Sequence, residues 1–264
     1  MSNRVLQAQE DALSSFQENI QPGRIGKMLL YFVGTNAAGQ TGDFSNLGNV
    51  TMKRNGETIV NRPVNILADK GNILKGSNLF SSAEAGAFVA SVNLPLFVDS
   101  FEQALQITGP SELNFEWTPA ASAAATFSDM QIYVYAEQSF LDEEYDYFLL
   151  GDDQTPGAAV TARPYQLNAA NIASLYITDP SGVLTSVGLR QNGEQIFSDQ
   201  PKNVLIAGTL YENRLEQTTI DMIELQTYTK GQGPSLLNKN TILELTTSGT
   251  GTITVTRESI RLKN

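Results

Sequence analysis

A ten-residue segment occurs twice in this 264-residue chain. Residues 50–59 read VTMKRNGETI and residues 187–196 read VGLRQNGEQI, so five of ten positions are identical at a separation of 137. The shared Asn-Gly pair is the preferred centre of a type I′ β-hairpin, because both central residues of that turn need positive φ. Unrelated hairpins can share this pair, so the match alone permits either a duplication or two independent hairpins.

Further matches occur in the same order in the two halves. Leu-Tyr-Phe at 30–32 precedes the first hairpin, as Leu-Tyr-Ile at 175–177 precedes the second. Gly-Pro-Ser stands at 109–111 and again at 233–235, before an alternating strand in each half. Self-similarity at a period above about 100 residues indicates repeated domains and not solenoid units. We therefore predict a duplicated chain, each half having about 100–115 residues, the size of one eight-stranded sandwich.

Short alternating segments bounded by Gly, Pro, Asn or Ser are found in both halves, which is the pattern of β-strands. Many short strands at turn-rich spacing predict an antiparallel sandwich or barrel. The predicted fold class is therefore all-β, with two tandem eight-stranded sandwiches. The segments expected as strands are residues 27–33, 57–60, 113–117, 131–135, 174–178, 204–206, 223–228, 242–246 and 252–256.

The first 23 residues are predicted to form a short N-terminal helix and arm. Apolar positions recur there at three- and four-residue steps, and the Pro-Gly pair at 22–23 would end the helix. The recurring positions are Val5, Leu6, Gln9, Ala12, Leu13, Phe16 and Ile20, all apolar except Gln9. An acidic segment with Pro and Gly, residues 138–165, is predicted to link a first domain at 24–137 to a second at 166–264.

Cysteine and histidine are both absent from the sequence. This absence excludes thiolate nucleophiles, disulfides, imidazole metal ligands and Ser-His-Asp triads. The net charge of −11 repels phosphate backbones and argues against nucleic-acid binding. The longest strongly apolar run, residues 28–33, is far shorter than the roughly 20 residues of a membrane-spanning helix. We expect a protein without enzymatic activity, export signal or membrane-spanning helix.

The densest acidic cluster lies in the predicted linker and comprises Asp142, Glu143, Glu144 and Asp146. Calcium takes about six to eight oxygen ligands, so these four residues are the candidate metal ligands. Their spacing does not match a D-x-D-x-D-G calcium loop, and charge runs in linkers are usually solvated. A solvated linker without metal is therefore the alternative interpretation.

Specific side chains suggest two further functions. Glu116 and Glu244 are the best carboxylate pair for glycoside hydrolysis, but residues equivalent across a duplication are expected in separate domains. The alternative function is a non-enzymatic carbohydrate-binding sandwich, either a lectin or a receptor-binding module. Its aromatic candidates are Trp117, Tyr145 and Tyr147, although the alternation around Trp117 predicts a place in the core.

With a predicted helix followed by two tandem all-β halves, paired Asn-Gly-Glu hairpins and neither His nor Cys, the chain resembles a known family. This family is the double jelly-roll major capsid proteins of tailless icosahedral bacteriophages with an internal membrane, in particular the corticovirus-like type. The resemblance covers residues 24–264 and rests on architecture and length, not on a diagnostic motif. It implies that each sandwich is a jelly roll. It also implies that three chains form a pseudo-hexagonal capsomer and that capsomers close into an icosahedral shell around a lipid membrane.

The resemblance also implies partners and a location. The expected partners are other copies of the chain in a homotrimer and in neighbouring capsomers, other virion proteins and an internal membrane. The expected location is the virion capsid, after assembly in the host cytoplasm. Calcium is the one cofactor expected, because a trimer would carry three times −11 charges and divalent cations between subunits would offset that repulsion.

Overall fold

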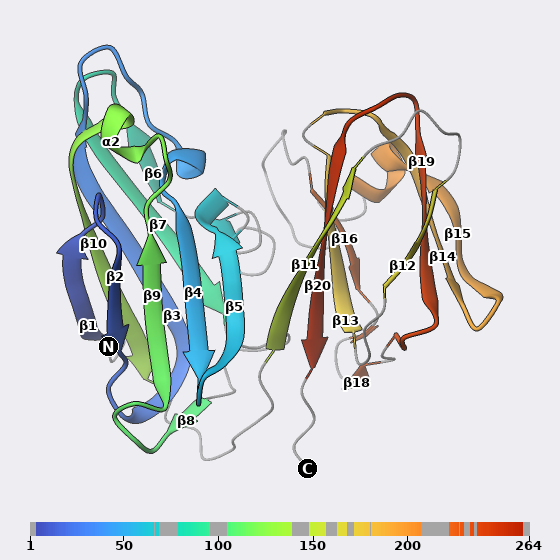
Figure 1. The fold of residues 1–264 in the computed structure, drawn as a ribbon, viewed down its shortest axis with the longest axis horizontal. Coiled ribbons are helices and arrows are strands. Elements are labelled where there is room, and N and C mark those ends of the chain that lie inside the picture. Colours follow the sequence, from blue (N-terminus) through green and yellow to red (C-terminus); the bar gives the residue numbers. More distant parts are fainter. Residues whose placement is uncertain are drawn as a thin grey trace. The chain divides into compact units, whose positions relative to one another are not determined.

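In the computed structural model the chain divides into two compact units, Met1–Phe148 and Leu149–Arg261 (Figure 1). Each unit is built from antiparallel sheets, so the all-β prediction is confirmed. The residues described are 4–65, 67–68, 79–95, 105–138, 148–156, 163–167, 172–179, 181–206, 222–226, 228–229, 233–234 and 237–260.

The first unit contains a six-stranded and a four-stranded sheet. The larger sheet has the order β1 (Arg4–Asp11), β10 (Phe127–Gln138), β3 (Gly23–Asn36), β7 (Ala87–Pro95) and β6 (Phe80–Ser82), and β8 (Leu105–Ile107) also pairs with β3. The smaller sheet has the order β2 (Phe16–Asn19), β9 (Leu113–Thr118), β4 (Asn49–Arg54) and β5 (Glu57–Pro63). Short helical segments are η1 (Phe44–Asn46), α2 (Ala123–Thr126) and residues 64–65 with 67–68.

The second unit contains two four-stranded sheets. One has the order β11 (Phe148–Pro156), β20 (Thr252–Ile260), β13 (Ile172–Thr178) and β16 (Met222–Gln226). The other has the order β12 (Arg163–Gln166), β19 (Thr241–Thr247), β14 (Leu184–Gln191) and β15 (Glu194–Pro201). Two short strands, β17 (Tyr228–Thr229) and β18 (Gly233–Pro234), pair with each other, and residues 202–206 are helical.

The two units have the same strand topology. The strand order β1-β10-β3-β7 of the first unit corresponds to the order β11-β20-β13-β16 of the second. In the other sheet, the order β2-β9-β4-β5 corresponds to β12-β19-β14-β15. With this correspondence the order of both sheets matches strand for strand, and the first unit adds only β6 and β8. The shared set of eight strands agrees with the predicted eight-stranded sandwiches.

Strand register repeats as well as strand order. On β4 and β9, Thr51 lies opposite Glu116, and on β14 and β19, Gly188 lies opposite Glu244. Thr51 and Gly188 are 137 positions apart, the separation found for the repeated segment. Because a one-residue slip turns every side chain to the other face of a sheet, the common register places equivalent residues on equivalent faces.

The two Asn-Gly pairs form the turns of equivalent hairpins, β4–β5 and β14–β15. The φ angles are 50° and 81° at Asn55 and Gly56, and 53° and 85° at Asn192 and Gly193. Positive φ at both central residues is the requirement of a type I′ turn, which Asn and Gly meet at least cost. The hairpins predicted from the repeated segment are confirmed.

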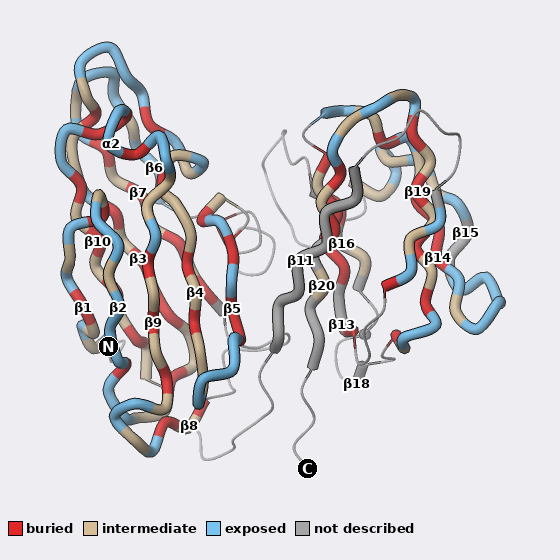
Figure 2. The backbone as a smooth tube through the Cα atoms, viewed as in Figure 1, coloured by how far each residue is buried: buried red, intermediate tan, exposed pale blue. Residues whose placement is uncertain are grey.

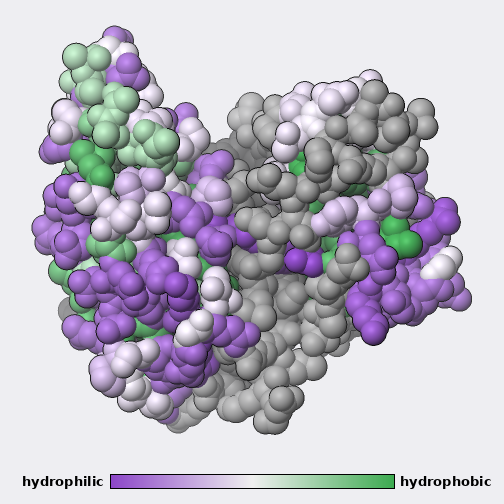
Figure 3. Space-filling view, in the orientation of Figure 1, coloured by the Kyte–Doolittle hydropathy of each residue, from purple (hydrophilic) through white to green (hydrophobic). Residues whose placement is uncertain are grey.

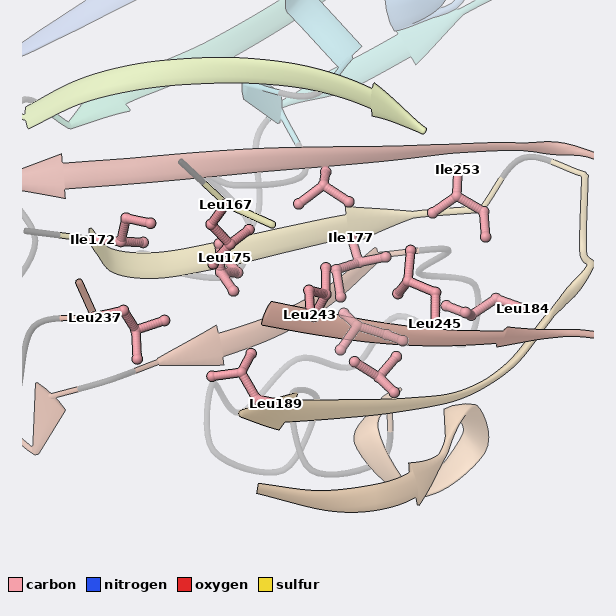
Figure 4. Close-up of a cluster of buried hydrophobic side chains, with 13 residues drawn as sticks. Leu167, Ile172, Leu175, Ile177, Leu184, Leu189, Leu237, Leu243, Leu245 and Ile253 are labelled. Carbon is pink, nitrogen blue, oxygen red and sulfur yellow. The ribbon is translucent and has the colours of Figure 1, made fainter. Parts of the chain in front are cut away.

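The cores of the two units differ in composition, although the alternation that builds them is the same. In the first unit Phe32 and Trp117 come from opposite sheets, with ring centroids 5.2 Å apart. In the second unit the buried cluster is aliphatic, and Leu243 and Leu245 of β19 face it at alternate positions (Figure 4). Its members are Leu167, Ile172, Leu175, Ile177, Leu184, Val187, Leu189, Ile223, Leu237, Leu243, Leu245, Ile253 and Val255. Figure 2 shows buried and less buried residues alternating along the central strands.

The predicted N-terminal helix is wrong, because its residues form β1 and β2. Strand β1 pairs with β10, and a β-bulge interrupts the register between Leu6 and Ala8. A bulge shifts the two-residue alternation by one position, so apolar residues on its two sides fall at irregular spacing. That spacing imitated a helical period. The long-range pairing with β10 and β9 decides the conformation instead.

Two other expectations also differ from the structure. The predicted linker, residues 138–165, includes β11 and most of β12, and the division between the units falls within it. Residues 204–206, expected as a strand, are helical. A run of three apolar residues is too short for its period to distinguish a strand from a helix.

Candidate functional site

The candidate metal ligands Asp142, Glu143, Glu144 and Asp146 lie outside the described residues, as do Tyr145 and Tyr147. Among the residues that the structure describes, no group of three or more acidic side chains is arranged to hold a metal ion. The calcium site therefore stays a prediction from sequence.

The two candidate catalytic carboxylates each form an ion pair within their own unit. Glu116 Oε1 lies 2.6 Å from Lys53 Nζ, and Glu244 Oε1 lies 3.1 Å from Arg190 Nε. Lys53 and Arg190 are themselves equivalent, 137 positions apart, so the repeat preserves a diagonal ion pair between neighbouring strands. All four side chains are at least a quarter exposed, so each pair contributes only about 0.2–1 kcal/mol. Glycoside hydrolysis needs two carboxyl groups close together, but the partner of each of these carboxylates is a basic side chain.

Trp117 is buried, with 1% of its surface exposed. Its indole Nε1 donates a hydrogen bond of 3.2 Å to the carbonyl oxygen of Ala12, and its ring packs against Phe32. The face of this ring is therefore not open to a sugar. The prediction that Trp117 lies in the core is confirmed, and the carbohydrate-binding alternative loses the only tryptophan in the sequence.

A polar cluster that sequence reasoning missed holds the loop before β9 in the first unit. Arg54 donates from Nε and Nη2 to Oε1 of Glu112, at 2.9 and 2.8 Å. The other carboxylate oxygen accepts from the backbone N–H of Thr108 at 2.8 Å, its hydroxyl at 2.9 Å and the N–H of Gly109 at 3.3 Å. Burial alone would raise the pKa of Glu112, but these hydrogen bonds outweigh it and lower the pKa to about 2.

A similar polar cluster organises the loop after β13 in the second unit. Asp179 is 2% exposed and accepts hydrogen bonds from the N–H groups of Val183 and Leu184, at 3.1 and 2.8 Å. Lys202, in the helical segment after β15, lies 3.0 Å from Asp179 Oδ2. Burial alone would raise the pKa of Asp179, but these bonds and the lysine charge lower it. The sequence signal was the Asp-Pro-Ser-Gly run at 179–182, a typical turn, which does not reveal the lysine partner.

Charged and polar side chains dominate the visible outer face of the first unit, over β2, β9, β4 and β5 (Figure 3). The large apolar side chains that are exposed are few among the described residues. They are Leu6, Val33, Leu79, Phe80, Ile196 and Val204. No described helix is long and apolar enough to cross a membrane. Among the residues that the structure describes, the features that remain as candidates for function are surfaces.

Comparison with solved structures identifies the fold. The major capsid protein of bacteriophage PM2 matches with a TM-score of 0.70 and 12% identity, over 100% of this chain and 98% of that one. The PBCV-1 virus capsid matches with a TM-score of 0.67 and 13% identity, over 98% and 94% of the two chains. A chain of Sulfolobus Turreted Icosahedral Virus matches at 0.70 and 11%, over 98% and 90%.

The fold is a double jelly roll. The first unit is one jelly roll and the second unit is the other, so the architecture expected from the resemblance is confirmed. No protein-family model and no curated protein matches the sequence. At 11–13% identity the likeness to these structures is one of fold.

Proposed function

We propose that this double jelly roll is a major capsid protein. Three copies form a pseudo-hexagonal capsomer, and capsomers assemble into an icosahedral shell around a lipid membrane. The observation that carries the proposal is that the whole chain, both rolls included, matches capsid proteins along nearly their whole length.

The internal repeat gives the proposal a physical basis. Two rolls of the same topology in one chain give a trimer six similar blocks, which suits a position with six neighbours in a shell. Packing two sheets face to face makes each block rigid and leaves the loops at its ends to vary. A protein of this design acts through its shape and its contacts.

A structural role without catalysis agrees with the interactions of four described carboxylates. Glu112, Glu116, Asp179 and Glu244 are each engaged with a lysine or arginine of the same unit. Structurally similar proteins from PM2 and PBCV-1 are capsid components. We infer that the chain is not an enzyme and that its location is the virion capsid.

The finer parts of the proposal come from the corticovirus-like resemblance. These are the internal membrane, the additional virion proteins and assembly in the host cytoplasm. The similarity to the PM2 capsid protein supports self-association, on which a shell around a membrane depends.

Light scattering coupled to size-exclusion chromatography tests the proposal most directly. The expected species has about 86 kDa, three times the chain mass of 28.7 kDa. Electron microscopy of that fraction should show particles with a near-hexagonal outline. A monomer that persists at every concentration and in the presence of calcium would contradict the capsid function.

A further inference from the structure

The two Asn-Gly pairs of the sequence, at 55–56 and 192–193, are each followed by Glu. An asparagine before glycine is especially prone to deamidation, because glycine has no Cβ to hinder attack of its backbone nitrogen on the asparagine amide. Both pairs lie at the exposed tips of equivalent hairpins, β4–β5 and β14–β15 (Figure 1). Since the two sites share their local sequence and their turn, a difference in reactivity between them must come from their surroundings.

Deamidation of such a pair proceeds through a cyclic imide. The glycine nitrogen loses its proton and forms a bond to Cγ of the asparagine, the Cγ–Nδ2 bond breaks, and Nδ2 leaves with that proton as ammonia. Water then opens the ring at one of its two carbonyl carbons, which gives aspartate or isoaspartate. The reaction therefore needs a glycine N–H without another partner and an asparagine amide that can turn towards it.

The peptide between asparagine and glycine meets the first requirement at both turns. In the part of the chain that the structure describes, neither Gly56 nor Gly193 donates its backbone N–H to an acceptor. Flipping this peptide alone converts a type I′ turn into a type II′ turn, whose first central residue has a ψ of about −120°. That ψ brings the glycine nitrogen beside Cβ, where the imide ring closes. Ring closure is thus compatible with intact strand pairing in both hairpins.

The asparagine side chains distinguish the two sites. Oδ1 of Asn192 accepts a hydrogen bond of 3.1 Å from Nδ2 of Asn240, in the loop before β19. The side chain of Asn55 forms no hydrogen bond with any residue that the structure describes. The amide of Asn192 must therefore leave a protein partner before it can turn towards the glycine nitrogen, whereas the amide of Asn55 leaves only water.

The loop before β9 explains why Asn55 lacks such a partner. Glu112 stands where Asn240 stands in the second roll, since each lies four residues before the equivalent residues Glu116 and Glu244. Its carboxylate is already bound to Arg54 and to the loop itself. Only the backbone of Asn55 contacts this loop, through a hydrogen bond of 2.8 Å from its N–H to the carbonyl oxygen of Glu112. That bond restrains φ and not ψ, so it does not oppose the peptide flip.

We propose that Asn55 is a site of spontaneous deamidation and that Asn240 protects Asn192 from the same reaction. The net stability of one neutral hydrogen bond corresponds to about a two- to tenfold change in population, so Asn55 should convert faster than Asn192 by that factor. Each conversion adds one negative charge to the first roll, next to Arg54 and Glu57. Isoaspartate also lengthens by one backbone carbon the two-residue turn that sets the register of the β4–β5 hairpin.

Peptide mapping by mass spectrometry, on the folded chain incubated at neutral pH, measures both sites in one sample. The expected result is conversion at Asn55 about two- to tenfold faster than at Asn192. In urea, where the hydrogen bonds of the fold are lost, the two sites should convert at equal rates, because both read Asn-Gly-Glu. The unfolded chain thus separates the chemistry of the local sequence from the effect of the structure.

Asn240→Ala tests the protection directly, because it removes an exposed side chain and keeps the backbone N–H that bonds to Asn238. In this variant Asn192 should convert as fast as Asn55, whose own rate should stay the same. Lys239→Ala, exposed in the same loop, is the matched control and should change neither rate. Circular dichroism shows that both variants fold.

Three results would overturn the proposal. The first is an equal or faster rate at Asn192 than at Asn55 in the folded natural chain. The second is an unchanged rate at Asn192 when Asn240 is replaced. The third is an intact Asn55 in the folded chain after the time in which the unfolded chain has converted completely.

Discussion

Replacing Glu112 with Gln should destabilise the first roll by an amount that depends on pH. The pKa of this carboxyl is lowered from 4.5 to about 2, and each pKa unit corresponds to about 1.4 kcal/mol. The full shift would amount to about 3 kcal/mol, and solvent screening at the loop reduces the expected loss to about 2 kcal/mol. The side chain is 12% exposed, so screening reduces the effect without removing it.

The sign of the pH dependence follows from the lowered pKa. A carboxyl that is more acidic in the folded state stabilises the protein fully above its unfolded pKa of 4.5. This stabilisation is lost as the pH falls from 4.5 through about 2, because the folded state then takes up the proton. The difference in unfolding free energy between the natural chain and Glu112→Gln should therefore be constant near neutral pH and shrink in acid.

Urea unfolding followed by tryptophan fluorescence measures the unfolding free energy of the first roll, in which Glu112 lies. Trp117 is the only tryptophan of the chain and is buried in the first roll, so its emission reports that roll. Glu116→Gln is the matched control on β9, the strand that follows Glu112, where a partly exposed ion pair predicts a loss below about 1 kcal/mol. A loss for Glu112→Gln that equals the control, or that does not change between neutral pH and pH 2, would refute the reasoning.

Three further predictions concern other parts of the chain. Lys202→Met should destabilise the second roll by about 3–5 kcal/mol at neutral pH, because Asp179 would stay buried without its cation. The loss should diminish in acid, where Asp179 takes up a proton, and thermal unfolding at a series of pH values measures it. Gly48→Ala should lower the free energy of unfolding by more than about 1 kcal/mol, because a Cβ would lie 2.2 Å from the carbonyl oxygen of Thr118 and Gly48 has a φ of +102°. An unchanged midpoint of chemical denaturation would contradict this. Removing the four acidic side chains of the linker should abolish any calcium-induced rise in melting temperature, whereas an undiminished rise would place the calcium elsewhere. The set to change to Asn and Gln is Asp142, Glu143, Glu144 and Asp146.

The parts of the fold that could be predicted are those determined by neighbours in sequence. Asn55 and Asn192 start type I′ turns because the turn chemistry is local, and the alternation around Trp117 placed that ring in the core. The segment containing Leu6 could not be predicted correctly, because its conformation depends on pairing with β10, more than a hundred residues away. Local periodicity carries no information about such a partner.

The polar clusters escaped prediction for a related reason. Arg54 and Glu112 are 58 positions apart, and Asp179 and Lys202 are 23 positions apart. From the sequence alone, each of these charged residues is expected to be solvated. The strand topology brings its partner to the same loop.

In the proposed trimer, the duplication has a consequence for the kinetics of assembly. A ring of six separate rolls would need five bimolecular encounters, each of which slows as the protein is diluted. Joining the rolls in pairs leaves only two such encounters, because each covalent connection holds its two rolls at an effective concentration on the order of millimolar. A chain that carries both rolls can therefore close its ring at dilutions where single rolls would stay apart, and incomplete rings have fewer forms in which to accumulate.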